Sequence, residues 1–106
     1  MKQDMPVFEY LIQTREAVDG FPLVIHMNDQ ARVYQPTGWS CQPIEGWGDF
    51  RFRTGDTEIS FSAEPPGVQV LIEGPMLREE ADRLVEVIST QLATHTGYAT
   101  VVVPLT

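Results

Sequence analysis

Basic residues are scarce in this chain, and cysteine occurs once. Seven of its 106 residues are lysine or arginine and fifteen are aspartate or glutamate, which gives a formal net charge of −8. Nucleic-acid binding depends on clustered lysine and arginine that release counterions from the phosphate backbone, so we expect no nucleic-acid partner. Because Cys41 has no second cysteine, no disulfide within the chain can form, and a reducing compartment is the simplest setting.

Long apolar runs and metal-ligand patterns are missing as well. No apolar stretch approaches the roughly 18 residues that cross a bilayer, and residues 1–6 lack the apolar core of a signal peptide. We therefore expect a cytoplasmic protein without a membrane partner. His26 and His95 stand far apart, and neither has a histidine or cysteine at ligand spacing, so we expect neither a metal site nor a cofactor.

No catalytic motif stands out either. Residues 38–41, Gly-Trp-Ser-Cys, lack the second glycine and the following helix of a nucleophile elbow. Residues 46–48, Gly-Trp-Gly, are followed by a strand pattern, whereas a phosphate-binding loop opens a helix. Cys41 could act as a nucleophile with His26, but any chain with a cysteine and a histidine offers such a pairing. An inert thiol is the simpler interpretation. We expect no catalytic residues and no enzymatic activity.

The amino-acid composition and length fit one globular domain spanning residues 1–106. Apolar residues make up 42% and charged residues 21% of the chain, which are ordinary values for a folded protein. The length lies near the usual domain size and is sufficient for a hydrophobic core without disulfides or metal. No repeat, low-complexity tract or linker-like stretch divides the chain.

The clearest predicted element is a helix that carries residues 77–92 and ends at Gly97. Its apolar residues recur at spacings of three and four, which gathers them on one face: Leu77, Ala81, Leu84, Val85, Ile88 and Leu92. A glycine at position 97 is suited to the left-handed conformation that closes many helices, and His95 in the last turn complements the helix dipole. Residues 98–103 then predict a strand, which Pro104 stops.

The middle of the chain predicts a three-stranded meander together with its register. Segments 50–54 and 57–61 flank Gly55-Asp56, a two-residue hairpin turn that places Phe52 opposite Ile59. The Pro65-Pro66 connection in turn places Ile59 opposite Ile72. Apolar residues therefore meet on one face. The opposite face carries the rows Arg53–Glu58–Glu73 and Arg51–Ser60–Leu71, and we expect Arg53 to pair with Glu58.

The first third of the chain fits more than one interpretation. Residues 6–18 suit a helix that runs to Gly20, although Phe8, Tyr10 and Ile12 also alternate as they would in a strand; we favour the helix. Residues 21–27, which include His26, and residues 32–35 predict two strands around a turn. The elements together predict an α+β two-layer sandwich, in which helices pack on one face of an antiparallel meander sheet and the long C-terminal helix is followed by a last strand.

Two surfaces are candidates for binding. The segment from Tyr34 to Trp47 combines large aromatic residues with glycine and proline, and tryptophan and tyrosine are favoured interface anchors. The alternative is that both tryptophans pack in the core. The polar face of the meander is the second surface. The candidate partner-binding residues are Tyr34, Trp39, Trp47, Arg51, Arg53, Glu58, Leu71 and Glu73.

The excess of acidic residues favours a basic protein partner, because opposite potentials speed encounter, although the same charge also serves solubility alone. Our hypothesis is a non-enzymatic acidic protein-binding module, such as a bacterial inhibitor or immunity-type protein that masks a basic partner. One alternative is an enzyme or small-ligand carrier with a pocket near Trp39, Cys41 and Trp47. Another is a structural subunit that forms a homodimer through a sheet edge such as residues 101–103.

Overall fold

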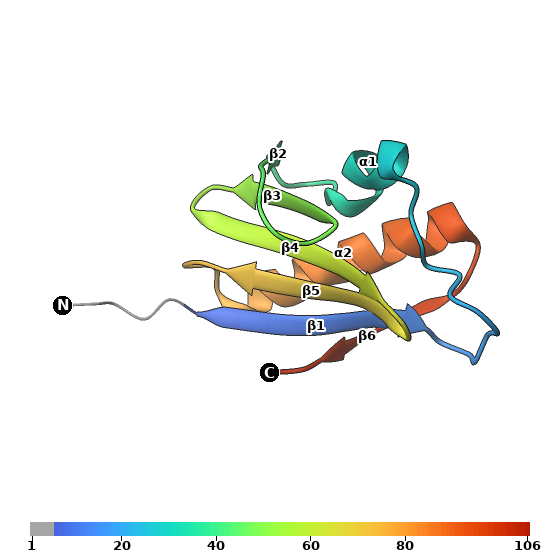
Figure 1. Ribbon diagram of the computed structural model, residues 1–106. Helices are drawn as coiled ribbons and strands as arrows, with labels where there is room; N and C mark the ends of the chain where they lie inside the picture. Colours follow the sequence, from blue (N-terminus) through green and yellow to red (C-terminus); the bar gives the residue numbers. More distant parts are fainter. Residues whose placement is uncertain (1–5) are drawn as a thin grey trace.

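The computed structural model describes residues 6–106, which form one six-stranded antiparallel sheet and two α-helices (Figure 1). The strand order across the sheet is β2-β3-β4-β5-β1-β6. The predicted α+β class, with a C-terminal helix followed by a last strand, is confirmed. In chain order the elements are β1 (Val7–Thr14), a 3-10 turn η1 (Met27–Asp29), α1 (Gln30–Tyr34), β2 (Gln42–Pro43), β3 (Phe50–Thr54), β4 (Thr57–Glu64), β5 (Gly67–Glu73), α2 (Arg78–Thr96) and β6 (Thr100–Pro104).

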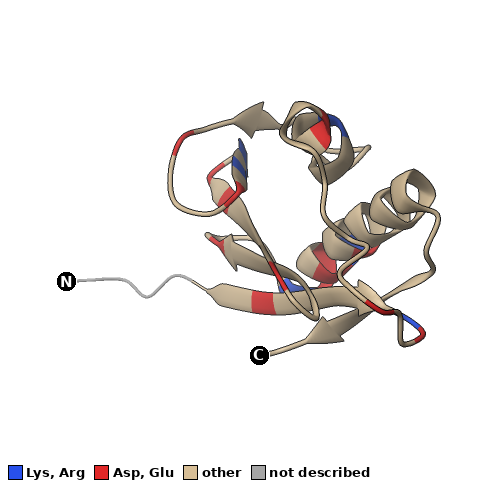
Figure 2. Ribbon diagram, turned by 45° about the vertical axis from the view of Figure 1, so that its right-hand side comes forward, with Lys and Arg blue, Asp and Glu red and all other residues tan. Residues whose placement is uncertain are grey.

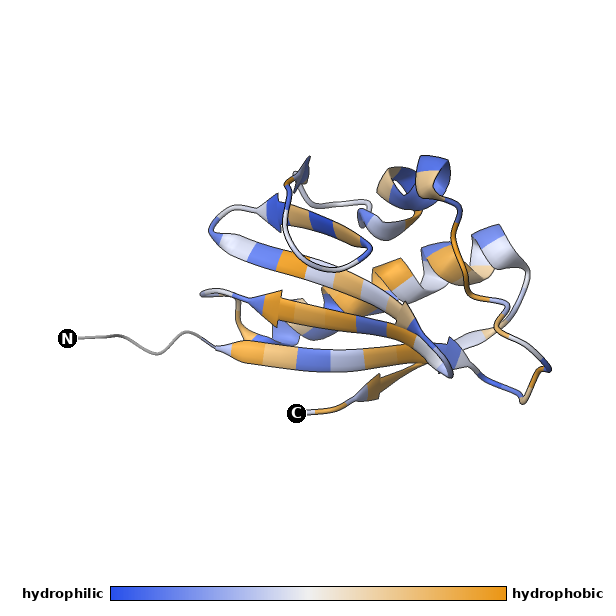
Figure 3. Ribbon diagram, in the orientation of Figure 1, coloured by the Kyte–Doolittle hydropathy of each residue, from blue (hydrophilic) through white to orange (hydrophobic). Residues whose placement is uncertain are grey.

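Strands β3, β4 and β5 form the predicted meander in the predicted register. Phe52 lies opposite Ile59, and Ile59 lies opposite Ile72. Gly55 has a φ of 59°, which the hairpin turn requires at that position. Along β3 the apolar and polar residues alternate (Figure 3), so that one face of the sheet is apolar and buried.

Helix α2 covers this apolar face and supplies the other half of the core. It begins at Arg78 and ends at Thr96, and Gly97 closes it with a φ of 83° while its N–H donates to the carbonyl of Ala93, as predicted. Residues 81, 84, 85, 88 and 92 of the predicted stripe are buried. Leu77 is the exception: it is the N-cap residue, its backbone is extended, and it is 75% exposed.

The favoured helix over residues 6–18 is wrong, since this segment contains β1. Strand β1 pairs with β5 on one side and β6 on the other, so both of its backbone edges are satisfied. Tyr10 and Ile12 alternate into the core, which is the strand pattern that competed with the helix pattern. The contacts that decide between the two come from strands that are distant in sequence.

The two strands predicted between residues 21 and 35 are also wrong. Residues 21–26 form an irregular segment, and His26 is exposed and caps η1 through Nδ1, which accepts from the N–H of Asn28. The consecutive residues Val33 and Tyr34 are both buried, which a short helix permits and a strand facing a single layer does not. Gln91 of α2 holds α1 in place by donating to the carbonyls of Val33 and Gln35.

Candidate functional site

The face of the sheet that points away from α2 is the open face. Figure 1 shows the connection between β2 and β3, residues 44–49, passing in front of the sheet, whereas α2 lies behind it. Because side chains alternate along a strand, the observed register assigns the residues of this face. They are Val7, Glu9, Leu11, Gln13, Gln42, Arg51, Arg53, Glu58, Ser60, Ser62, Glu64, Gln69, Leu71, Glu73, Val101 and Val103.

Trp47 lies at the centre of the β2–β3 connection and is 54% exposed. Two glycines flank it, and the chain at Gly48 approaches β4 so closely that a Cβ there would lie 2.7 Å from the carbonyl oxygen of Phe61. Asp49 secures the end of the connection, since its N–H donates to Phe61 O and its carboxylate accepts from the N–H of Ala63. The backbone that presents this exposed indole is therefore anchored to the sheet.

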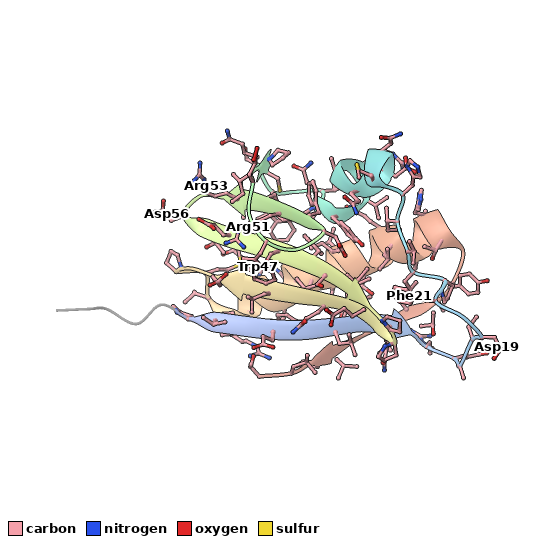
Figure 4. The ribbon with its side chains drawn as sticks, viewed as in Figure 1. Asp19, Phe21, Trp47, Arg51, Arg53 and Asp56 are labelled. Atoms are coloured by element: carbon pink, nitrogen blue, oxygen red, sulfur yellow. The ribbon has the colours of Figure 1, made fainter. Side chains whose placement is uncertain are left out.

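Arg51 lies under Trp47, with its guanidinium carbon 5.6 Å from the centre of the indole ring (Figure 4). Its side chain is only 12% exposed. Its Nη2 donates to Glu58 and lies 3.7 Å from the carboxylate of Glu73. The expected ion pair between Arg53 and Glu58 is therefore wrong, because Glu58 pairs with Arg51. Arg53 and Glu58 are nevertheless directly opposite each other, as predicted. Arg51 is covered by the β2–β3 connection, whereas Arg53 is exposed at the end of the hairpin, where water solvates its charge.

A groove of about 290 Å³ opens beside this cluster, lined by Val7, Arg51, Asp56, Glu58, Glu73 and Gly74. Its lining holds three carboxylates and one guanidinium, a formal charge of −2. The side chains of Glu58 and Glu73 are 39% and 42% exposed, so each carboxylate faces solvent as well as Arg51. Arg53 does not line the groove. The groove is therefore an acidic surface next to an exposed indole.

Aliphatic side chains of β5, β1 and β6 also lie on the open face, with polar residues between them. Leu71 on β5 lies opposite Glu9, and Leu11 on β1 lies opposite Gln69 on one side and Val103 on the other. Gln69 donates a hydrogen bond to Glu9 between the two leucines. Together with Val101 the aliphatic side chains are half-buried and have no helix above them. The open face thus combines an acidic groove, an aromatic side chain and aliphatic side chains that Glu9 and Gln69 divide into two groups.

The structure separates the two tryptophans and removes Tyr34 from the surface. Trp39 is half-buried against the core on the α2 side, where its Nε1 donates to Glu80 at 3.0 Å. Trp47 lies on the open face, so the sheet stands between the two indoles. The ring of Tyr34 is buried and stacks on Phe61 with centroids 4.3 Å apart. The candidate residues that come together are therefore Trp47, Arg51, Glu58, Leu71 and Glu73, with Arg53 at their margin.

Cys41 lies on the Trp39 side, not in the groove. Its Sγ is 3.5 Å from the carbonyl oxygen of Trp39, and burial raises the pKa of the thiol. Burial therefore disfavours the thiolate that a nucleophile needs. The residues that sequence reasoning missed at the groove are Val7, Asp56 and Gly74. Val7 was missed because a helix was predicted over residues 6–18. Asp56 could have been found from the predicted hairpin turn, because that turn adjoins the row Arg53–Glu58–Glu73.

Within residues 6–106, no three His, Cys, Asp or Glu side chains are grouped to hold a metal ion. Over the same residues, no helix has both the length and the apolar character needed to cross a membrane. Comparisons with models of protein families, with curated proteins and with solved structures found no match to this chain. Its function therefore has to be inferred from the geometry of the open face.

Proposed function

We propose that this protein is a non-enzymatic protein-binding module and that it binds its partner through the open face around Trp47. The observation that carries the proposal is the exposed indole of Trp47, supported from below by Arg51 and anchored by hydrogen bonds to β4. Tryptophan and arginine are the residues most often found as energetic hot spots of protein interfaces. A rigidly presented indole loses little conformational entropy when a partner covers it.

The charge of the chain favours a basic partner. Figure 2 shows acidic residues on β1, on the β2–β3 connection and on α2, and far fewer basic positions. A negative potential accelerates encounter with a positively charged surface and discriminates against acidic ones. Such a surface suits an inhibitor that masks a basic site on its partner, and a bacterial immunity-type protein is the concrete version that we propose.

The two edge strands of the sheet favour binding through the open face and disfavour the alternative, a homodimer formed by pairing of edge strands. Strand β2 has two residues, and Pro43 has no N–H to offer. On β6, the carbonyl of Ala99 and the N–H of Leu105 form hydrogen bonds with β1. Because bonding residues alternate along an antiparallel strand, the backbone N–H and C=O groups of Thr100, Val102 and Pro104 point away from β1, toward the open edge. Only two of these three residues have an N–H. Short edges that carry proline are the usual protection against edge pairing.

Affinity capture with matched variants tests the proposal. Wild-type protein and Trp47→Ala, Glu73→Gln, Trp39→Phe and Glu86→Gln variants would be immobilised and exposed to extract of the source cell, and a retained protein would then be titrated by calorimetry. We expect Trp47→Ala to weaken binding about 30-fold, equivalent to the ~2 kcal/mol of a hot spot. Trp39→Phe should bind as the wild type does, because that indole lies on the other side of the sheet.

Association kinetics separate the role of the acids from that of the indole. Glu73→Gln should slow association and flatten its dependence on salt, whereas Trp47→Ala should mainly speed dissociation. Glu86→Gln makes the same change in net charge on the exposed side of α2 and should affect association less. Undiminished affinity in Trp47→Ala, with Trp39→Phe impaired instead, would contradict the proposal and move the interface to the α2 side.

A further inference from the structure

The β2–β3 connection, residues 44–49, is a strap that is hydrogen-bonded to the sheet only at its two ends. At one end the N–H of Ile44 donates to the carbonyl of Arg51, and at the other Asp49 bonds to β4 through its N–H and its carboxylate. Residues 45–48 are all exposed and form no backbone hydrogen bond with the described part of the chain. Segments with few buried contacts and few hydrogen bonds are those that open while the rest of a protein stays folded.

The strap covers polar groups that have no partner. Ser60 is 1% exposed although its side chain points to the open face, where Figure 1 shows no helix, so its cover comes from the strap and the neighbouring side chains. The strap reaches β4 at the next residue, since a Cβ at Gly48 would lie 2.7 Å from the carbonyl oxygen of Phe61. Ser60 Oγ and Arg51 Nη1 are both buried and form no hydrogen bond within the described residues. Closure of the strap therefore leaves these two groups without water and without a partner.

The unpaired groups work against the closed position of the strap. Leaving a buried polar group without a hydrogen bond shifts an equilibrium roughly five- to 150-fold toward the state in which water reaches that group. The stacking of Trp47 on the Arg51 guanidinium and the two hydrogen bonds of Asp49 act in the opposite direction. These opposing contributions are of similar size, so the strap is held closed less firmly than the strands beneath it.

We infer that the strap opens and closes as a unit while the sheet stays folded, and that the buried hydroxyl of Ser60 sets how often it opens. Opening separates Trp47 from Arg51 and removes the support beneath the exposed indole. The strap is thus a conformational device that assembles and dismantles the Trp47 surface. Its control over partner binding rests on the proposed function, whereas the opening itself does not.

Amide hydrogen exchange, followed by nuclear magnetic resonance on the intact chain without any partner, tests the inference. The N–H groups of Ile44 and Asp49 report opening of the strap, because their hydrogen bonds hold its two ends. The hydrogen-bonded amides of β5, which is paired on both sides, report unfolding of the sheet. After correction for intrinsic exchange rates, we expect Ile44 and Asp49 to exchange at least tenfold faster than the amides of β5.

Two serine variants isolate the effect of the buried hydroxyl. Ser60→Ala removes the unpaired group and keeps the shape of the closed strap, so the protection of Ile44 and Asp49 should rise together by about fivefold or more. Ser62→Ala makes the same change two residues further along β4, where the hydroxyl is half-buried and bonded to Glu64. This control should leave the protection of both amides within about twofold of the wild type.

A variant in the strap itself should act in the opposite direction. Gly48 has a φ of 95°, and a side chain there would meet the carbonyl oxygen of Phe61. We expect Gly48→Ala to favour the open strap and to lower the protection of Ile44 and Asp49 about tenfold, while the amides of β5 exchange as in the wild type.

Two outcomes overturn the inference. Exchange of Ile44 and Asp49 at the rate of the β5 amides would mean that the strap opens only when the sheet unfolds. Equal protection in Ser60→Ala and Ser62→Ala would mean that the buried hydroxyl does not set the equilibrium. Both measurements remain decisive if Gly48→Ala does not fold. Because no partner is present, the result is independent of the proposed function, which the affinity of Trp47→Ala tests separately.

Discussion

Replacing Leu84 with alanine tests the packing of α2 on the sheet, and Leu77→Ala provides a control with the same chemistry. The two leucines belong to one apolar stripe in the sequence, but Leu84 is fully buried whereas Leu77 is 75% exposed. Truncating a fully buried leucine removes its transfer free energy and leaves a cavity, at a cost of about 2–5 kcal/mol. The same truncation at an exposed position changes the free energy of unfolding by about 0.5 kcal/mol or less.

Urea unfolding followed by circular dichroism measures this difference. Small domains are stable by about 5–15 kcal/mol, so a loss in the middle of the expected range would be about a third of the total. With a urea dependence of roughly 2 kcal/mol per molar, its midpoint should fall by about 1–2.5 M. The Leu77 variant should unfold close to the wild type. Equal midpoints for the two variants would refute the orientation of α2 described above.

Three further predictions follow from single positions. Gly55→Val should destabilise the protein by about 1–2 kcal/mol in thermal unfolding, because the φ of 59° disfavours a branched side chain, whereas Gly55→Asn should cost less. Burial raises the pKa of Tyr34, so the folded state should lose stability as the pH rises above about 10, the unfolded value, and Tyr34→Phe should reduce that loss in alkaline urea titrations. Acrylamide should quench Trp47 strongly and Trp39 weakly, which single-tryptophan variants would measure; equal quenching would contradict the exposed position of Trp47.

The elements predicted correctly are those whose determinants are close in sequence. The register of β3, β4 and β5 follows from two short connections, because each turn sets which residues face each other. Helix α2 follows from its apolar spacing and from Gly97. The fold class could be predicted for the same reason. The two rows on the polar face, which contain most of the candidate site, were a direct consequence of this local register.

The elements predicted wrongly depend on distant partners. Strand β1 has a period that fits both a helix and a strand, and it becomes a strand because β5 and β6, far along the chain, satisfy its two edges. The helix α1 is likewise held by Gln91 of α2. Local propensity is a weak prior in such segments, and tertiary hydrogen bonds decide between the alternatives.

The same division runs through the candidate site. The amino-acid sequence by itself determined that Arg51, Glu58 and Glu73 share the polar face, because side chains alternate along paired strands. Only the tertiary structure decided that Arg51, not Arg53, pairs with Glu58, since that choice depends on which arginine the β2–β3 connection shields from water. It also placed Trp47 on the open face, whereas Trp39 packs behind the sheet. A loop's path over a sheet is set by non-local contacts, such as those of Asp49 with β4, and no local pattern encodes them.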